Sequence, residues 1–218
     1  MRSKDINLND YDPKQAANVA RRRTGVARLL DHWRVFFQGF VQHPKMVGSI
    51  IPSSRFTVEK MLAPVKWDEC KLFVEYGPGV GTFCQPVLDR LPADGRLVVI
   101  DTNPLYIRYL RRTIDDPRFH AVQGSAEHVE TIVQSHGHEH ADYVLSGLPF
   151  STLPDGVGPA IAAATHRVLR PGGAFLVYQF SDKARDFMAQ HFAHIDQGFE
   201  LWNVLPCKLF WGWKGQPA

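Results

Sequence analysis

The sequence predicts an α/β fold built on a doubly wound, mostly parallel sheet, and three observations support this fold class. From Lys71 onward, short apolar runs alternate with longer amphipathic segments, which is the pattern of strands joined by crossover helices. A glycine-rich loop at 77–81 follows the first apolar run, and Asp101 ends the next one. Such a loop followed by an acid at the next strand end is typical of a parallel sheet that binds a nucleoside.

The elements follow from this alternation in chain order. We expect strands at 71–76, 96–101, 118–122, 141–147 and 173–180, and helices near 82–91, 104–114, 126–134, 156–169 and 182–191. Residues 170–173 contain Pro and two glycines, so a turn is predicted before the fifth strand. Residues 199–205 and 208–214 are expected to close the sheet as an antiparallel pair.

The N-terminal segment differs from the rest in charge and pattern. Residues 1–48 contain nine Lys or Arg and four Asp or Glu, whereas residues 49–218 have two more acids than bases. A helix is predicted over 14–42, because one arc of about 140° gathers apolar side chains: Val26, Leu29, Leu30, Trp33, Phe36, Phe37, Phe40 and Val41. We therefore expect a basic amphipathic helical extension over 1–47. The sheet domain follows over 48–218, starting with a serine-capped helix at 55–63.

Composition excludes several classes of protein. The three cysteines are far apart and form no CxxC pair, so neither a disulfide framework nor a structural zinc site is expected, and a reducing cytoplasm fits. The sequence contains no apolar run of the roughly 18 residues that span a bilayer, and its polar start has no secretory pattern. The cluster at 136–140 with three histidines is predicted to be a solvated loop, and no metal is expected.

Four motifs carry the chemistry of this chain. In order they are Glu75-x-Gly77-x-Gly79-x-Gly81, Asp101, Gly124-Ser125-Ala126-Glu127 and Ser146-Gly147-Leu148-Pro149-Phe150. Over roughly residues 45–214, the set resembles the class I S-adenosylmethionine-dependent methyltransferases. The resemblance implies a Rossmann-like methyltransferase fold with a seven-stranded sheet and S-adenosyl-L-methionine as cofactor. A nicotinamide dinucleotide site is the main competing use of such a fold, but it has GxGxxG spacing rather than this acid-first GxGxG.

The resemblance also implies which residues bind the cofactor. The 77–81 loop would pass under its methionine and ribose parts, and Asp101 would accept hydrogen bonds from both ribose hydroxyls, because a carboxylate has acceptors only. Residues 125–127 would border the adenine, and Ser146 and Gly147 would lie beside the sulfonium methyl. The full predicted set is Glu75, Tyr76, Gly77, Gly79, Gly81, Asp101, Thr102, Ser125, Ala126, Glu127, Ser146 and Gly147.

A second set of motifs concerns the acceptor. Residues 48–55, 146–150, 178–180 and 203–206 together resemble the bacterial phospholipid N-methyltransferases of the soluble, membrane-associating kind. This resemblance implies methylation of phosphatidylethanolamine towards phosphatidylcholine. A basic amphipathic helix with Trp and Phe on its apolar face suits reversible binding to an anionic membrane surface. We therefore expect a cytoplasmic protein at the inner face of the membrane, although the same helix would suit a lid over the cofactor site.

The main task of the protein in this reaction is to align the amine with the methyl group of the cofactor. Methyl transfer to nitrogen is an in-line displacement on an activated sulfonium, so positioning supplies most of the barrier reduction. Aromatic faces suit methylated ammonium groups, and Phe150 and Tyr178 are predicted to form such a wall. Arg55, at a helix start, is predicted to meet the lipid phosphate, and Ser146 completes the candidate catalytic set. Cys84 is not expected to act as a nucleophile, because nothing beside it lowers its pKa.

Two other acceptor classes stay open at this stage. A small-molecule N-methyltransferase is one, since the fold does not determine the substrate. The other is an adenine N6-methyltransferase of ribosomal RNA, whose Asn-x-Pro-aromatic motif residues 146–150 also resemble. Ser146 stands where that family needs Asn, and residues 49–218 are slightly acidic, so nucleic acid is disfavoured as a partner.

Overall fold

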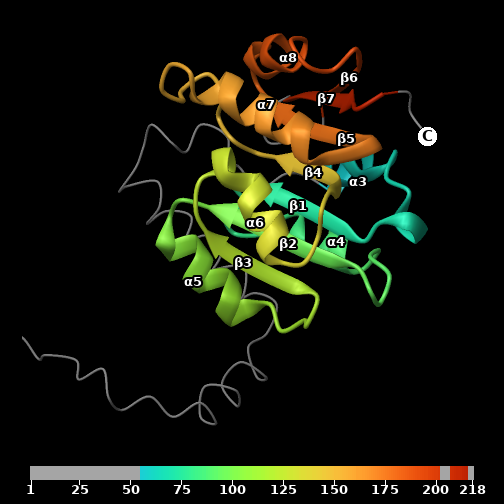
Figure 1. Ribbon diagram of the computed structural model, residues 1–218, viewed down its shortest axis with the longest axis vertical. Coiled ribbons are helices and arrows are strands. Elements are labelled where there is room, and N and C mark those ends of the chain that lie inside the picture. The colour runs from blue at the N-terminus through green and yellow to red at the C-terminus, as the bar shows by residue number, and fades with distance from the viewer. Residues whose placement is uncertain (1–54, 202–206, 216–218) are drawn as a thin grey trace, which may run out of the picture. The chain divides into compact units, whose positions relative to one another are not determined.

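The structure is a computed structural model that describes residues 55–201 and 207–215 (Figure 1). The predicted N-terminal extension over 1–47, the 48–54 loop and the 203–206 motif lie outside the described residues. The helix predicted at 55–63 is present as α3 (Arg55–Leu62).

A sheet of seven strands forms the centre of the described part of the chain, in the order β3-β2-β1-β4-β5-β7-β6 (Figure 1). The strands are β1 (Leu72–Tyr76), β2 (Arg96–Asp101), β3 (Phe119–Gln123), β4 (Ala141–Ser146), β5 (Leu169–Gln179), β6 (His194–Glu200) and β7 (Cys207–Trp213). Neighbouring strands run parallel except at β7, which is antiparallel to both β5 and β6. The predicted mostly parallel, seven-stranded sheet is confirmed.

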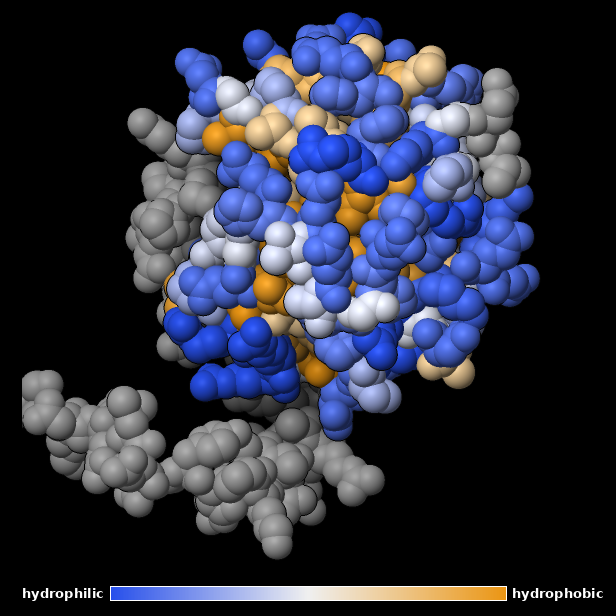
Figure 2. Space-filling view, in the orientation of Figure 1, coloured by the Kyte–Doolittle hydropathy of each residue, from blue (hydrophilic) through white to orange (hydrophobic). Residues whose placement is uncertain are grey.

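Helices cover both faces of this sheet. One face carries α3, α4 (Cys84–Leu88) and α5 (Pro104–Thr113), and the other carries α6 (Val129–Ser135), α7 (Val157–Val168) and α8 (Lys183–Met188). Each face has its own cluster of buried apolar side chains. Because the central strands are buried on both sides, their sequences are continuous apolar runs without alternation. On the side seen in Figure 2, hydrophilic side chains predominate and apolar ones lie mostly in recesses between them.

Two predicted boundaries in the C-terminal half are wrong. β5 begins at Leu169 rather than at 173, because Leu169 pairs with Ala141 before a register irregularity that Gly172 accommodates at φ 77°. The edge strand β6 spans His194–Glu200 rather than 199–205. Most side chains of β6 are exposed, so this strand lacks the apolar run by which strands are recognised in sequence.

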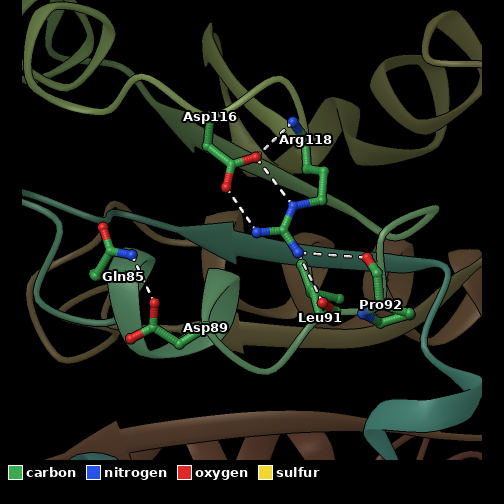
Figure 3. A network of polar contacts seen from close by, with 6 residues as sticks. All are labelled: Gln85, Asp89, Leu91, Pro92, Asp116 and Arg118. Atoms are coloured by element: carbon green, nitrogen blue, oxygen red, sulfur yellow. Dashed lines mark hydrogen bonds and ion pairs between the residues drawn. The ribbon is translucent and has the colours of Figure 1, made fainter.

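Polar side chains tie the strand starts together at the amino edge of the sheet. Asp142, at the start of β4, accepts the backbone amides of Lys71 and Leu72 at 2.8 Å each, and Arg170 of β5 donates to its other oxygen. Near the start of β3, Arg118 pairs with Asp116 at 2.7 Å and donates to the Leu91 carbonyl at 2.7 Å (Figure 3). These ties lie at the amino edge, whereas the loops with the predicted site residues lie at the opposite, carboxyl edge.

Candidate active site

Four strand ends meet at the carboxyl edge where the strand order reverses. β1 lies between β2 and β4, and Tyr76 is in register with Ile100 on one side and Ser146 on the other. The amide of Gly77 donates to the Ile100 carbonyl at 2.9 Å, and the amide of Gly147 donates to the Tyr76 carbonyl at 3.1 Å. Such a switch point is where open α/β sheets bind their ligands.

The loop after β1 requires glycine for its backbone path. Gly77, Gly79 and Gly81 have φ angles of 61°, 55° and 83°, a region that side chains rarely allow. A Cβ at Gly77 would lie 2.9 Å from Leu148, and one at Gly81 would lie 2.6 Å from Leu110. The loop therefore forms a cradle of bare main chain, as the sequence predicted.

Glu75 is a buried acid beside this loop. Its residue is 1% exposed, and among the described residues no Lys or Arg pairs with it. Burial, reinforced by the charge of Asp101, raises the pKa of Glu75 to about 8, while the Cys84 thiol donates to the carboxylate at 3.5 Å. A buried carboxylate without a protein cation suits a cationic ligand group. Burial and Glu75 also raise the pKa of Cys84, so this thiol stays protonated.

Asp101 ends β2 and is joined to the glycine loop. Its carboxylate accepts the amide of Asn103 at 2.8 Å and the amide of Gly79, and burial raises its pKa to about 6. Asn103 in turn caps α5 by accepting the Leu105 amide at 2.9 Å. Asp101 is only partly exposed and, within the described residues, has no cation partner, so its remaining acceptor positions are available to hydroxyl groups.

The third and fourth strand ends are turns shaped by serines. Ser125 accepts the Glu127 amide at 3.3 Å, and its hydroxyl donates to the Glu127 carboxylate at 3.0 Å, which starts the short helix at Ala126. The Ser146 hydroxyl accepts the Leu148 amide at 3.2 Å. Thr102, after β2, is exposed. The structure thus brings all twelve predicted cofactor positions to this one edge, but the Tyr76 side chain points into the core, where its hydroxyl lies 3.1 Å from that of Thr165.

The candidate catalytic residues separate into different environments. Tyr178 lies over Gly147, where an added Cβ would overlap its hydroxyl, and its ring is 5.0 Å from that of Phe83. Phe150 is 4% exposed and packs against Phe175 and Phe187 in the core cluster beneath α7 and α8. These contacts assign the Phe150 ring to packing and give no support to its predicted place in an aromatic wall. Arg55 is exposed at the start of α3.

Two residues at the site had no individual role in the sequence analysis. Gln179 is 4% exposed and donates to the Leu148 carbonyl at 2.6 Å, so it holds the loop after β4. Tyr106, in the first turns of α5, has a buried hydroxyl with no hydrogen-bond partner among the described residues. Burial and the neighbouring Asp101 carboxylate raise its pKa. The only signal for Tyr106 was its position five residues after Asp101.

These features fit S-adenosylmethionine. The glycine cradle admits a ligand against the main chain, and a cationic methionine end beside Glu75 would favour its charged form, which supplies the matching negative charge. Asp101 offers acceptors to ribose hydroxyls, and the unsatisfied Tyr106 hydroxyl points to a polar group in the same place.

Comparison with known proteins decides the family. A model of a methyltransferase domain matches residues 73–173. An ornithine lipid N-methyltransferase of Singulisphaera acidiphila is 30% identical over 178 residues, which cover 81% of this chain and 93% of that relative. The chain belongs to the class I S-adenosylmethionine-dependent methyltransferases. The methyltransferase uses S-adenosylmethionine to methylate a nitrogen acceptor.

Solved structures share the fold of this methyltransferase at low identity. The N-methyltransferase NodS of Bradyrhizobium japonicum, in complex with S-adenosyl-L-homocysteine, is 15% identical with a TM-score of 0.58, covering 74% of this chain and 87% of that one. Precorrin-6y C5,15-methyltransferase of Geobacter metallireducens is 16% identical with a TM-score of 0.60, covering 74% and 89%.

Other polar clusters of the methyltransferase lie apart from the site. A surface cavity at the β3 edge is lined by Arg111, Ile114, Phe119, His120, Ala121, Val122 and His136, none of which is a predicted site residue. Within 55–201 and 207–215, no group of three or more His, Cys, Asp or Glu is arranged to hold a metal ion. In the same ranges, none of the helices combines the length and the apolar character that crossing a membrane requires.

The buried acid makes stability depend on pH. In the ligand-free protein, the folded chain keeps a proton on Glu75 up to about pH 8, whereas the unfolded chain releases it near pH 4.5. Through this group, the free energy of unfolding falls by up to about 1.4 kcal/mol per pH unit as pH rises between those values. We expect urea unfolding to show this loss in wild type and not in Glu75→Gln between about pH 6.5 and 8. If the unfolding free energies of wild type and Glu75→Gln change with pH in the same way, Glu75 does not have the raised pKa of a buried acid without a cation partner.

Phe150 and Tyr178 should respond differently to substitution. Phe150→Ala should cost about 3–5 kcal/mol of stability by opening a cavity, whereas Phe150→Leu should be folded and turn over substrate. Tyr178→Phe keeps the aromatic face and should retain turnover, whereas Tyr178→Leu should keep cofactor affinity but lose turnover by at least about tenfold. Thermal unfolding, calorimetric cofactor binding and steady-state kinetics separate these effects. Wild-type turnover in Tyr178→Leu would remove the proposed role of its ring.

The Tyr106 hydroxyl should matter only when the cofactor binds. Tyr106→Phe removes no hydrogen bond of the described protein, so its stability should not fall, but its affinity for S-adenosyl-L-homocysteine should drop by roughly three- to tenfold. Tyr143→Phe is the matched control, because that hydroxyl accepts the Lys66 amide at 3.1 Å. The control should lose stability and keep its affinity in titration calorimetry; equal affinities for wild type and Tyr106→Phe would refute the contact.

Proposed function

We propose that this methyltransferase transfers methyl groups to the amine of a phospholipid headgroup, converting phosphatidylethanolamine towards phosphatidylcholine at the inner face of the membrane. The proposal rests on one observation: the chain matches an ornithine lipid N-methyltransferase, an enzyme named for a lipid amine, over 93% of that enzyme's length. The phospholipid motifs support the same acceptor class, and the basic excess of residues 1–48 favours an anionic surface.

The relative also favours a second acceptor. Its name assigns it to ornithine lipid, and an ornithine headgroup carries an amine without a phosphate. The two acceptors share a primary amine on a membrane lipid. They differ in the phosphate that the exposed Arg55 is proposed to meet at the start of α3.

In the proposed mechanism, the protein binds and aligns the two reactants. The cofactor supplies a methyl group activated on a sulfonium. Asp101 and the glycine cradle hold the nucleoside, while Gln179 fixes the loop after β4 through the Leu148 carbonyl. The amine must lose a proton before it attacks, and carbonyl, hydroxyl or water acceptors at the site take it. The ring of Tyr178 offers a face to the methylated ammonium product.

Methyl-labelled S-adenosylmethionine tests the acceptor class directly. The purified full chain is incubated separately with vesicles containing phosphatidylethanolamine, vesicles containing ornithine lipid, total RNA and a pool of small amines. We expect label in phosphatidylethanolamine; label in ornithine lipid alone would select the second acceptor. Label confined to RNA or to small amines would refute a lipid acceptor.

A pair of variants controls this assay. Asp101→Asn removes the charge at the end of β2 and should abolish label in every arm by weakening cofactor binding. Asp115→Asn makes the same chemical change at an exposed position after α5 and should retain activity.

A further inference from the structure

The exposed large apolar side chains gather at one edge of the protein. Within the described residues they are Phe56, Phe180, Phe199 and Leu201, exposed by 64%, 39%, 48% and 65%. Phe180 directly follows β5, and Phe199 and Leu201 lie at the end of β6, which runs in the same direction as β5 because both are antiparallel to β7. This is the carboxyl edge, which also carries the cofactor residues.

Contacts between α3 and β6 bring Phe56 to the same edge. Lys60 donates to the Phe199 carbonyl at 2.6 Å and lies 3.8 Å from the Glu200 carboxylate. Phe56 is four residues before Lys60, so the two share a face of α3. The Trp211 indole donates to the Met61 carbonyl at 3.0 Å and fixes the helix on β7. Phe56 is therefore held near the end of β6.

The four side chains come from both sides of the sheet. Glu200 pairs with Cys207 and reaches Lys60 on the α3 side. The preceding residue, Phe199, pairs with Lys208 and therefore points to the other side, where Lys208 contacts Asp182 before α8. A groove on one face would not collect side chains in this way, whereas a flat partner lying across the edge would contact them together.

The charges at this edge favour an anionic partner. Four acids on the elements that carry these side chains have cation partners: Glu59 pairs with Arg90, Asp182 with Lys208, Asp186 with Arg185 and Glu200 with Lys60. Arg55 and Lys183 are exposed and, in the described part of the chain, have no acid partner. Exposed cations of the described chain thus lie close to these apolar residues.

We propose that this edge is a bilayer-docking surface, defined by Phe56, Phe180, Phe199 and Leu201 with Arg55, Lys60 and Lys183, which inserts into the headgroup region of an anionic phospholipid membrane. Single apolar side chains among cations match interfacial insertion. When the protein docks by this edge, the cofactor site is directed towards the lipid headgroups. The proposal rests on the proposed lipid acceptor for its purpose, but its contact with the membrane is measured independently.

Vesicle binding of the full chain tests the surface. Phe56→Ser/Phe199→Ser changes two exposed residues outside the predicted catalytic set, so folding and affinity for S-adenosyl-L-homocysteine should be unchanged. Flotation with vesicles of phosphatidylglycerol and phosphatidylcholine should show binding at least about tenfold weaker than wild type. Methylation of short-chain phosphatidylethanolamine below its critical micelle concentration should be retained. Wild-type flotation by the double variant would overturn the proposal.

A charge variant and its control sharpen the test. Lys183→Glu should weaken binding to the anionic vesicles by several-fold, whereas Arg112→Glu, an equal charge change on α5, should not. Equal losses of vesicle binding in Lys183→Glu and Arg112→Glu would overturn the proposal. It would also be overturned if wild type is a dimer in solution, Phe56→Ser/Phe199→Ser is a monomer, and the two float equally with vesicles. If wild type labels no lipid but the double variant still loses flotation, the proposed function fails and the docking surface stands.

Discussion

The arrangement of the site depends on Asp142, a nearly buried acid at the opposite edge of the sheet. Its carboxylate accepts two amides at the start of β1 and the guanidinium of Arg170 from β5, so one side chain joins β1, β4 and β5 where these strands begin. Buried carboxylates are stable only when such partners replace water. Because parallel strands have fixed spacing, this tie sets the register that places Tyr76 beside Ser146. The strand ends then deliver the glycine loop and the loop after β4 to one place.

The two edges of the sheet divide stability and function between them. At the amino edge, Asp142 and Arg118 are hydrogen-bonded and paired. At the carboxyl edge the protein keeps features that cost stability in the absence of ligand: three glycines with positive φ, the unpaired Glu75 and the unsatisfied Tyr106 hydroxyl. We expect the cationic end of the cofactor to offset the burial of Glu75, and a polar group of the cofactor to pair with the Tyr106 hydroxyl. Ligand binding and stability are therefore coupled at this edge, and the site is a region where local rules are broken for function.

The sequence predicted what depends on local pattern and missed what depends on neighbours. The buried strands β1, β2 and β4 were visible as apolar runs, and Glu75 and Asp101 were placed by the motifs at their ends. β6 was misplaced, since an edge strand needs little apolar surface and its pairing is decided by β7. Phe150 and Tyr178 are both aromatic residues near strand ends, and only the path of the loop after β4 sends Phe150 into the core. Tyr106 carries no motif; its unsatisfied hydroxyl emerges only from packing.

The charge of the methylated product determines which side chains can hold it and still release it. A quaternary ammonium keeps its charge at every pH, so a carboxylate in contact with it in a low-dielectric site would retain it by several kcal/mol. An aromatic face attracts such a cation by only about 0.5–2 kcal/mol. Glu75 lies behind the glycine loop beside Cys84, whereas Tyr178 lies over Gly147 at the end of β4. An acceptor that approaches from the proposed bilayer-docking edge would meet the aromatic ring rather than the buried acid.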